Sequence, residues 1–181
     1  AFVKIWCDGQ QKLRWYALAG LAAAFTAANE LPALAFFALL AVALLWKNWR
    51  LTSAGFAPLA VLVFAAAFGT NYWAHDSWRP PYAHRSATDP DDNWYHYTYS
   101  LGGKERQSYW LDPQGIDKGE PRIVDYAFHC FVGHHGIFSL TPIWLLSAWG
   151  TWLWLRSGTT EERQLAAGIV LLTAVVLTFY I

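Results

Sequence analysis

The stretch TSAGFAPLAVLVFAAAFGT, residues 52–70, decides the fold class because it carries no charged side chain over the length of a membrane-spanning helix. Such a helix needs about 17–25 predominantly apolar residues. Further apolar runs lie at 15–30, 31–46, 139–155 and 165–181. The chain is 55% hydrophobic and 14% charged, whereas soluble domains carry about 25% charged residues. We therefore predict an all-α integral membrane protein with about five transmembrane helices and one irregular, aromatic-rich extracytoplasmic insertion.

The predicted organisation has three parts, which are N-terminal membrane helices (1–70), the insertion (71–138) and C-terminal membrane helices (139–181). The first two runs are separated by Asn29-Glu30-Leu31-Pro32, so they form two tight spans or one long broken element. The chain stops at Ile181 inside an apolar run and contains no Met. We therefore expect a piece of a longer protein.

Basic residues outside 71–126 fall in the N-terminal flank, a turn at 47–50 and a turn at 156–164. They are Lys4, Lys12, Arg14, Lys47, Arg50, Arg156 and Arg163. With five spans these segments share one side, and the positive-inside rule makes that side cytoplasmic. We predict a multi-pass protein of the cell (inner) membrane, with a cytoplasmic N-terminus and an extracytoplasmic 71–138. Cys7 and Cys130 then lie on opposite sides of the membrane and should not pair.

The outer segment is rich in Trp and Tyr, and acidic residues outnumber basic ones within 71–126. Residues 93–101 and 106–111 alternate aromatic and polar side chains around Gly-Gly-Lys-Glu, which predicts a β-hairpin. The acidic run at 89–92 is typical of a solvated turn. The aromatic residues form either an interfacial belt or a platform on which a sugar or a lipid headgroup stacks.

The segment HCFVGHHGIFSLTP, residues 129–142, contains His129, His134 and His135. Their spacing prevents one helical face from presenting all three imidazoles. Gly133 and Gly136 flank the His pair and favour a turn that leads into the fourth span. The histidines line a polar pocket, contact an anionic substrate, bind a divalent metal or ligate a tetrapyrrole. No cofactor is firmly predicted, and the three are weak candidates as metal ligands.

Three segments carry a family resemblance, namely LAGLAAAFTAANELPALAF (18–36), GTNYWAHDSWRPPY (69–82) and GHHGIFSLTPIWLL (133–146). They resemble the central part of bacterial polytopic glycosyltransferases of the C superfamily, and an uncharacterised group of multi-pass proteins carrying the HHGIFSLTP segment. The resemblance implies a polyprenyl-phosphate sugar donor used on the outer face. An Arg-Pro pair of the family is replaced here by Asn29 to Pro32, and a turn Arg by histidine. The family's catalytic acid belongs to a first outer loop that residues 1–181 lack.

Two classes of function follow. The first is a membrane glycosyltransferase-like protein with unknown catalytic residues, whose substrate-binding residues would be Glu30, Asp76, Arg79, Arg85, His134 and His135. Glu30 is included because an acid at a span boundary is a functional candidate, although it can also simply face water. The alternative is a non-catalytic accessory subunit of a larger respiratory or photosynthetic membrane complex, with other membrane subunits as partners and His ligating a pigment or metal. We expect no nucleic-acid partner.

Overall fold

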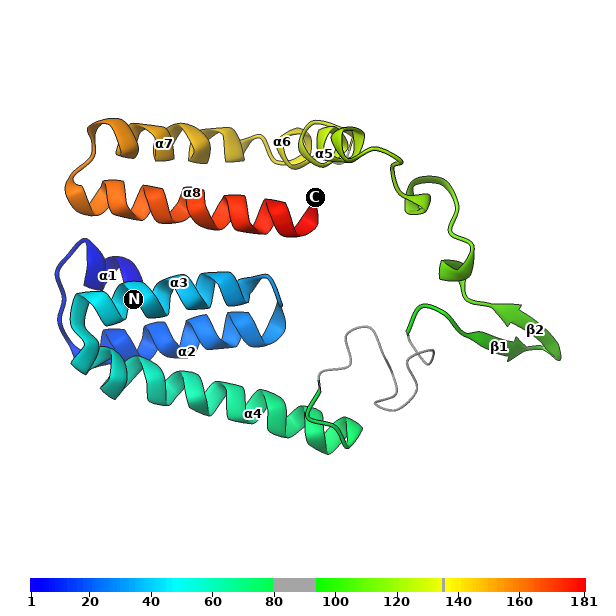
Figure 1. Ribbon diagram of the computed structural model, residues 1–181, viewed down its shortest axis with the longest axis horizontal. Helices are drawn as coiled ribbons and strands as arrows, with labels where there is room; N and C mark the ends of the chain where they lie inside the picture. Colours follow the sequence, from blue (N-terminus) through cyan, green and yellow to red (C-terminus); the bar gives the residue numbers. More distant parts are fainter. Residues whose placement is uncertain (80–93, 135) are drawn as a thin grey trace. The chain divides into compact units, whose positions relative to one another are not determined.

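The computed structural model describes residues 1–79, 94–134 and 136–181, of which 73% are helical (Figure 1). The elements in chain order are α1 (Phe2–Trp6), α2 (Leu13–Asn29), α3 (Ala33–Leu51), the π-helical turn η1 (Thr52–Phe56), α4 (Ala57–His75), β1 (Thr98–Leu101), β2 (Lys104–Gln107), the 3-10 turns η2 (Tyr109–Leu111) and η3 (Gly115–Lys118), α5 (Ile123–Phe131), α6 (Ile137–Leu140), α7 (Ile143–Ser157) and α8 (Thr160–Tyr180). The chain divides into two compact units. The first unit joins residues 1–65 to 127–181, and the second comprises 66–126.

A helix occupies most of each predicted apolar run, but the bounds differ. The break at Glu30–Pro32 separates α2 from α3, so the first two runs are two helices. Helix α4 continues to His75, so five residues that were assigned to the outer segment are helical. Before α7 the chain leaves the helical conformation at Thr141 (φ −137°), because Pro142 disfavours helical dihedrals in the residue that precedes it.

Helix length and composition do not support five transmembrane helices. Two helical stretches are long and apolar enough to cross a bilayer, Ala33–His75 and Thr160–Tyr180. Helices α2 and α7 contain only 17 and 15 residues, which correspond to about 26 and 22 Å, shorter than a hydrocarbon core of about 30 Å. The predicted fourth span starts at Ser139, but helix α7 starts only at Ile143, so four residues of that apolar run are lost from the helix.

The stretch Ala33–His75 is a helical hairpin and not one rod. Asn48 has non-helical dihedrals (φ −160°, ψ 92°) within it, which confirms the predicted turn at 47–50. The Phe37 ring lies 5.2 Å from the Phe64 ring, whereas 27 residues of straight helix would span about 40 Å. Helix α4 therefore turns back along α3, as Figure 1 shows.

Side chains of the N-terminal segment stabilise this reversal. The Asn48 amide donates a hydrogen bond to Gln11 Oε1 (3.1 Å), and the Tyr16 hydroxyl donates to the same oxygen (2.8 Å). The Thr52 hydroxyl donates to the Asn48 carbonyl (2.8 Å). The linker between α1 and α2 is thus tied to the turn between α3 and α4.

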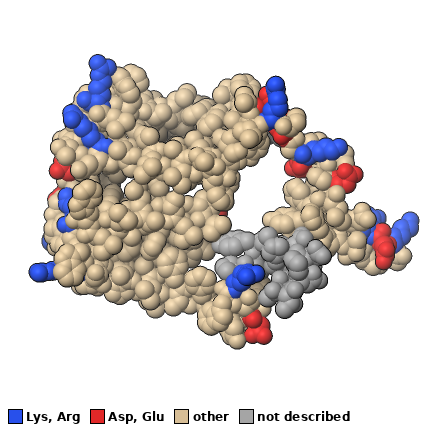
Figure 2. All heavy atoms as spheres, viewed as in Figure 1, with Lys and Arg blue, Asp and Glu red and all other residues tan. Residues whose placement is uncertain are grey.

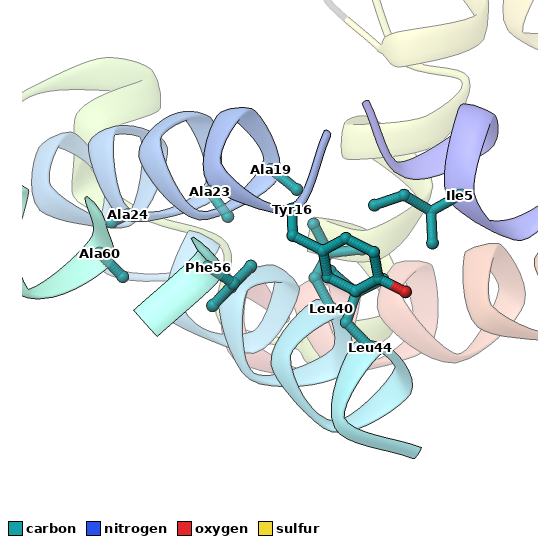
Figure 3. Close-up of a cluster of buried hydrophobic side chains, with 9 residues drawn as sticks. All are labelled: Ile5, Tyr16, Ala19, Ala23, Ala24, Leu40, Leu44, Phe56 and Ala60. Carbon is teal, nitrogen blue, oxygen red and sulfur yellow. The ribbon is translucent and has the colours of Figure 1, made fainter. Parts of the chain in front are cut away.

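The core of the first unit lies between α1, α2, α3, η1 and the start of α4 (Figure 3). Its buried side chains are Ile5, Tyr16, Ala19, Ala23, Ala24, Leu40, Leu44, Phe56 and Ala60. Small residues on α2 let η1 approach its backbone, because a Cβ added to Gly20 would lie 2.2 Å from the Phe56 carbonyl oxygen. Small residues that let two helix backbones approach closely are typical of helix packing where the hydrophobic effect does not drive association, as in lipid.

Helix α8 starts with a capping box. The Thr159 hydroxyl accepts the Glu162 N–H (3.3 Å), and the Glu162 carboxylate accepts the Thr159 N–H (2.7 Å). Helix α8 packs against α7 and, through Gly168 beside Leu39, against α3. Residues 143–157, all of which the structure describes, include no buried side chain, so α7 presents its aromatic residues outward.

The second unit contains the predicted hairpin, with shorter strands. Strands β1 and β2 are antiparallel, with Leu101 opposite Lys104. The loop is only Gly102-Gly103, both in the left-handed region (φ +62° and +74°), as a two-residue hairpin turn of the primed type requires. The predicted strands were separated by four residues, Gly-Gly-Lys-Glu, but Lys104 and Glu105 already pair with β1 and belong to β2. The two glycines alone form the turn, because glycine adopts left-handed dihedrals without strain.

Candidate functional site

The first candidate site is the turn between α5 and α6. His129 lies in the last turn of α5. Two backbone hydrogen bonds then reverse the chain. The Val132 N–H donates to the Phe128 carbonyl (2.8 Å), and the Gly136 N–H donates to the Gly133 carbonyl (2.8 Å). The Ser139 hydroxyl closes the reversal by donating to the Val132 carbonyl (2.9 Å). The predicted turn is confirmed over the described residues 132–134.

Glycine is required on both sides of this turn. A Cβ on Gly133 would lie 2.8 Å from His129 Nδ1 and 2.7 Å from the His129 carbonyl oxygen. A Cβ on Gly136 would lie 2.6 Å from the Phe131 carbonyl carbon. The two glycines therefore let the chain fold tightly and present His134, whose side chain is exposed.

Helix α5 is amphipathic. Ile123, Val124 and Phe128 lie on one side of it and are 68%, 76% and 58% exposed, whereas Asp125 and His129 lie on the other side at helical spacing. Such a helix suits a membrane–water interface, with the apolar side toward the acyl chains.

The start of α5 is held by an ion pair. Arg122 donates two hydrogen bonds to the Asp125 carboxylate (2.7 and 2.9 Å). This hydrogen bonding raises the pKa of the Arg122 guanidinium. Asp125 also lies in the first turn of the helix, where the helix dipole favours a negative charge.

The second candidate site is the turn that follows α4, within the second unit. The Asn71 amide donates to the carbonyls of Ser77 (2.6 Å) and Arg79 (3.2 Å). The Ser77 hydroxyl in turn accepts the Arg79 N–H (3.1 Å). Asp76 adopts a left-handed conformation (φ +50°). This turn carries two predicted site residues, Asp76 and Arg79, both of them exposed.

The other predicted site residues belong to other parts of the chain. Glu30 is exposed at the C-cap of α2, where its N–H donates to the Thr26 carbonyl (3.1 Å). Glu30 and His134 lie on separate turns of the first unit. Arg85, His135 and the acidic run at 89–92 lie outside the described residues. Over 1–79, 94–134 and 136–181 the structure contains no group of three His, Cys, Asp or Glu side chains that could hold a metal ion.

Two structural amides were missed by the sequence analysis. Asn71 organises the turn that carries Asp76 and Arg79, and Asn48 organises the hairpin of α3 and α4. Each is an amide at the end of an apolar run, where a side chain that can both donate and accept often replaces lost helical hydrogen bonds. That pattern is the signal that could have indicated them.

No protein-family model, curated protein or solved structure matches this chain.

Proposed function

We propose that the chain is a multi-pass membrane protein that binds a lipid-phosphate-linked saccharide on the outer face, as glycosyltransferases of the C superfamily do. The observation that carries the proposal is the glycine-bounded turn that presents His134 directly after the amphipathic helix α5. A helix lying in the outer interface would place this turn at the depth of a lipid phosphate.

The proposed topology has five membrane segments and a cytoplasmic N-terminus. Helices α3 and α4 have 19 residues each and α8 has 21, and about 28–32 Å of helix matches the hydrocarbon core. Helices α2 and α7 are shorter, and a bilayer accommodates short segments by local thinning. The Lys and Arg residues of the first unit lie in or next to helix ends on the proposed inner side, in accord with the positive-inside rule. They are Lys4, Lys12, Arg14, Lys47, Arg50, Arg156 and Arg163.

The proposed binding chemistry is recognition of phosphate. A ring N–H of His134 would donate a charge-assisted hydrogen bond to an anionic phosphate oxygen. Within the second unit, the Arg79 guanidinium has the geometry to bind a phosphate or a carboxylate, and Asp76, three residues before it, could accept a sugar hydroxyl. We assign no catalytic base to this chain, so the proposal covers donor binding and not glycosyl transfer.

Alanine at His134 and His135 should weaken binding of a short-chain polyprenyl-phosphate sugar about tenfold, because one lost charge-assisted hydrogen bond is worth about 1.5–3 kcal/mol. Native mass spectrometry of the purified chain with this lipid measures the affinity. His96→Ala, a histidine substitution in the second unit, is the control and should bind like the wild type. Unchanged affinity in the double variant would overturn the assignment and leave the accessory-subunit alternative.

The proposed topology predicts asymmetric cysteine labelling. Both Cys7 and Cys130 are free thiols, and a membrane-impermeant maleimide should reach Cys130 from the outside and Cys7 only after the membrane is opened. The pKa of the Cys7 thiol is raised, chiefly by loss of hydration and to a smaller extent by the negative charges of Asp8, Glu162 and Glu161. Its thiolate is therefore scarce near about pH 7.5, and its labelling should accelerate more between about pH 7.5 and 9 than that of a free cysteine.

Mass spectrometry of intact spheroplasts and of opened membranes checks both statements, with Cys7→Ser and Cys130→Ser variants identifying the labelled site. Labelling of Cys7 from the outside would reverse the proposed orientation.

A further inference from the structure

Each of four basic side chains at the proposed cytoplasmic end lies over a tryptophan ring. Lys47 Nζ is 5.0 Å from the Trp6 ring centroid. The guanidinium carbons of Arg14, Arg50 and Arg156 are 5.0, 5.6 and 5.3 Å from Trp15, Trp49 and Trp152. Such cation–π pairs orient the cation by the ring quadrupole and leave its outer face open to a further ligand.

These pairs converge within the first unit. Lys47 at the end of α3 reaches Trp6 of α1, and Asn48 bonds to Gln11. The start of α8 lies close to the same place, because Glu161 and Glu162 act electrostatically on Cys7. Figure 2 shows the basic side chains of this unit gathered over the end where α1, the end of α3 and the turn between α7 and α8 lie.

The acidic residues at this end are largely occupied by other contacts. Asp8 bonds to Lys4 (2.7 Å), and the Glu162 carboxylate caps α8. In the part of the chain that the structure describes, Lys47, Arg50 and Arg156 have indole rings and not carboxylates as their close partners. The end thus carries positive charge that the described protein does not neutralise.

Exposed indoles lie beside the same cations. Trp46 is 89% and Trp49 63% exposed, next to Lys47 and Arg50 in sequence. Large exposed indoles are unfavourable in water but typical of the membrane interface, where the ring meets acyl chains and the polar edge meets headgroups. A soluble anion would neutralise the cations but would leave these rings uncovered, whereas a phospholipid contacts both groups.

We propose that this basic–aromatic end, formed by Lys47, Arg50 and Arg156 with Trp46 and Trp49, binds the phosphate of anionic phospholipids of the inner leaflet. The inference rests on the membrane arrangement proposed above, but not on donor binding at His134. Each Lys or Arg near an anionic leaflet contributes several-fold to the affinity, so the three cations together give a marked preference for anionic over zwitterionic lipid.

The experiment compares retention of phosphatidylglycerol and phosphatidylcholine of identical acyl chains on the purified chain by native mass spectrometry. The test variant is Lys47→Gln/Arg50→Gln/Arg156→Gln. Lys104→Gln/Arg106→Gln/Lys118→Gln in the second unit removes the same charge and serves as the matched control. We expect the wild type and the control to prefer phosphatidylglycerol, and the test variant to lose at least about tenfold of that preference.

Three outcomes would overturn the inference: equal retention of the two lipids by the wild type, an equal loss in the matched control, or displacement of phosphatidylglycerol by inorganic phosphate alone. A Lys47→Arg/Arg50→Lys/Arg156→Lys variant, which keeps every charge, should retain the preference and shows whether a loss comes from charge or from misfolding. Binding of the polyprenyl-phosphate sugar to the same preparations reports separately on the outer site, so failure of one proposal is distinguishable from failure of the other.

Discussion

Replacing Gly20 by alanine should destabilise the first unit by about 3 kcal/mol, because a Cβ at this position would overlap the backbone of η1. The added carbon would lie 2.2 Å from the Phe56 carbonyl oxygen and 2.7 Å from the Phe56 Cα. Neither atom belongs to a flexible side chain, so α2 and η1 must separate and the core between them must loosen. The loss is expected although alanine favours a helix over glycine by about 1 kcal/mol.

Gly150→Ala is the matched control for this prediction. Gly150 also lies within a helix of an apolar run, but no described heavy atom lies within 4 Å of its added Cβ. The control should therefore be neutral or more stable by up to about 1 kcal/mol. Unfolding by SDS in mixed micelles, followed by tryptophan fluorescence, gives both free energies. Equal stability of the two variants would show that α2 does not approach η1 as closely as the structure shows.

Replacing Tyr16 by alanine should cost about 3 kcal/mol or more, because removing a fully buried aromatic ring leaves a cavity. Tyr16 is fully buried among Ile5, Leu40 and Leu44 (Figure 3). Its hydroxyl also positions Gln11, which holds Asn48 at the reversal between α3 and α4. The variant therefore loses packing and a link between the N-terminal segment and the hairpin.

Tyr16→Phe separates these two contributions. Phenylalanine keeps the ring but removes the hydroxyl donor, so we expect a cost of only about 1 kcal/mol. Gln11 Oε1 still accepts the hydrogen bond from Asn48 in this variant. The same SDS titration measures both substitutions. A loss in Tyr16→Phe as large as in Tyr16→Ala would show that the hydrogen-bond network, and not the packed ring, dominates.

Sequence patterns predicted the helices because apolar composition is a local property. The runs at 31–46 and 52–70 cover most of α3 and most of α4, and the turn at 47–50 contains the break at Asn48. The hairpin was also predictable, since Gly102-Gly103 is a strong local turn signal. Element ends were less accurate, as the continuation of α4 to His75 shows.

The candidate sites were only partly predictable. The turn around His134 followed from its two glycines, which act on neighbouring backbone. The turn that carries Asp76 and Arg79 depended on Asn71, whose side chain reaches six and eight residues ahead. No periodic pattern marks a contact of that kind, because it is set by the direction in which the chain leaves α4.

The sequence by itself determined the apolar helical character of the chain, its polar aromatic insertion, its hairpin and the segregation of its basic residues. Each of these follows from composition or from neighbours a few residues apart. Only the tertiary structure decided how closely α2 approaches η1 at Gly20, how Gln11 joins Tyr16 to Asn48, and which tryptophan lies under Lys47. These features need atoms from separate elements to meet, and their positions depend on the packing of whole helices.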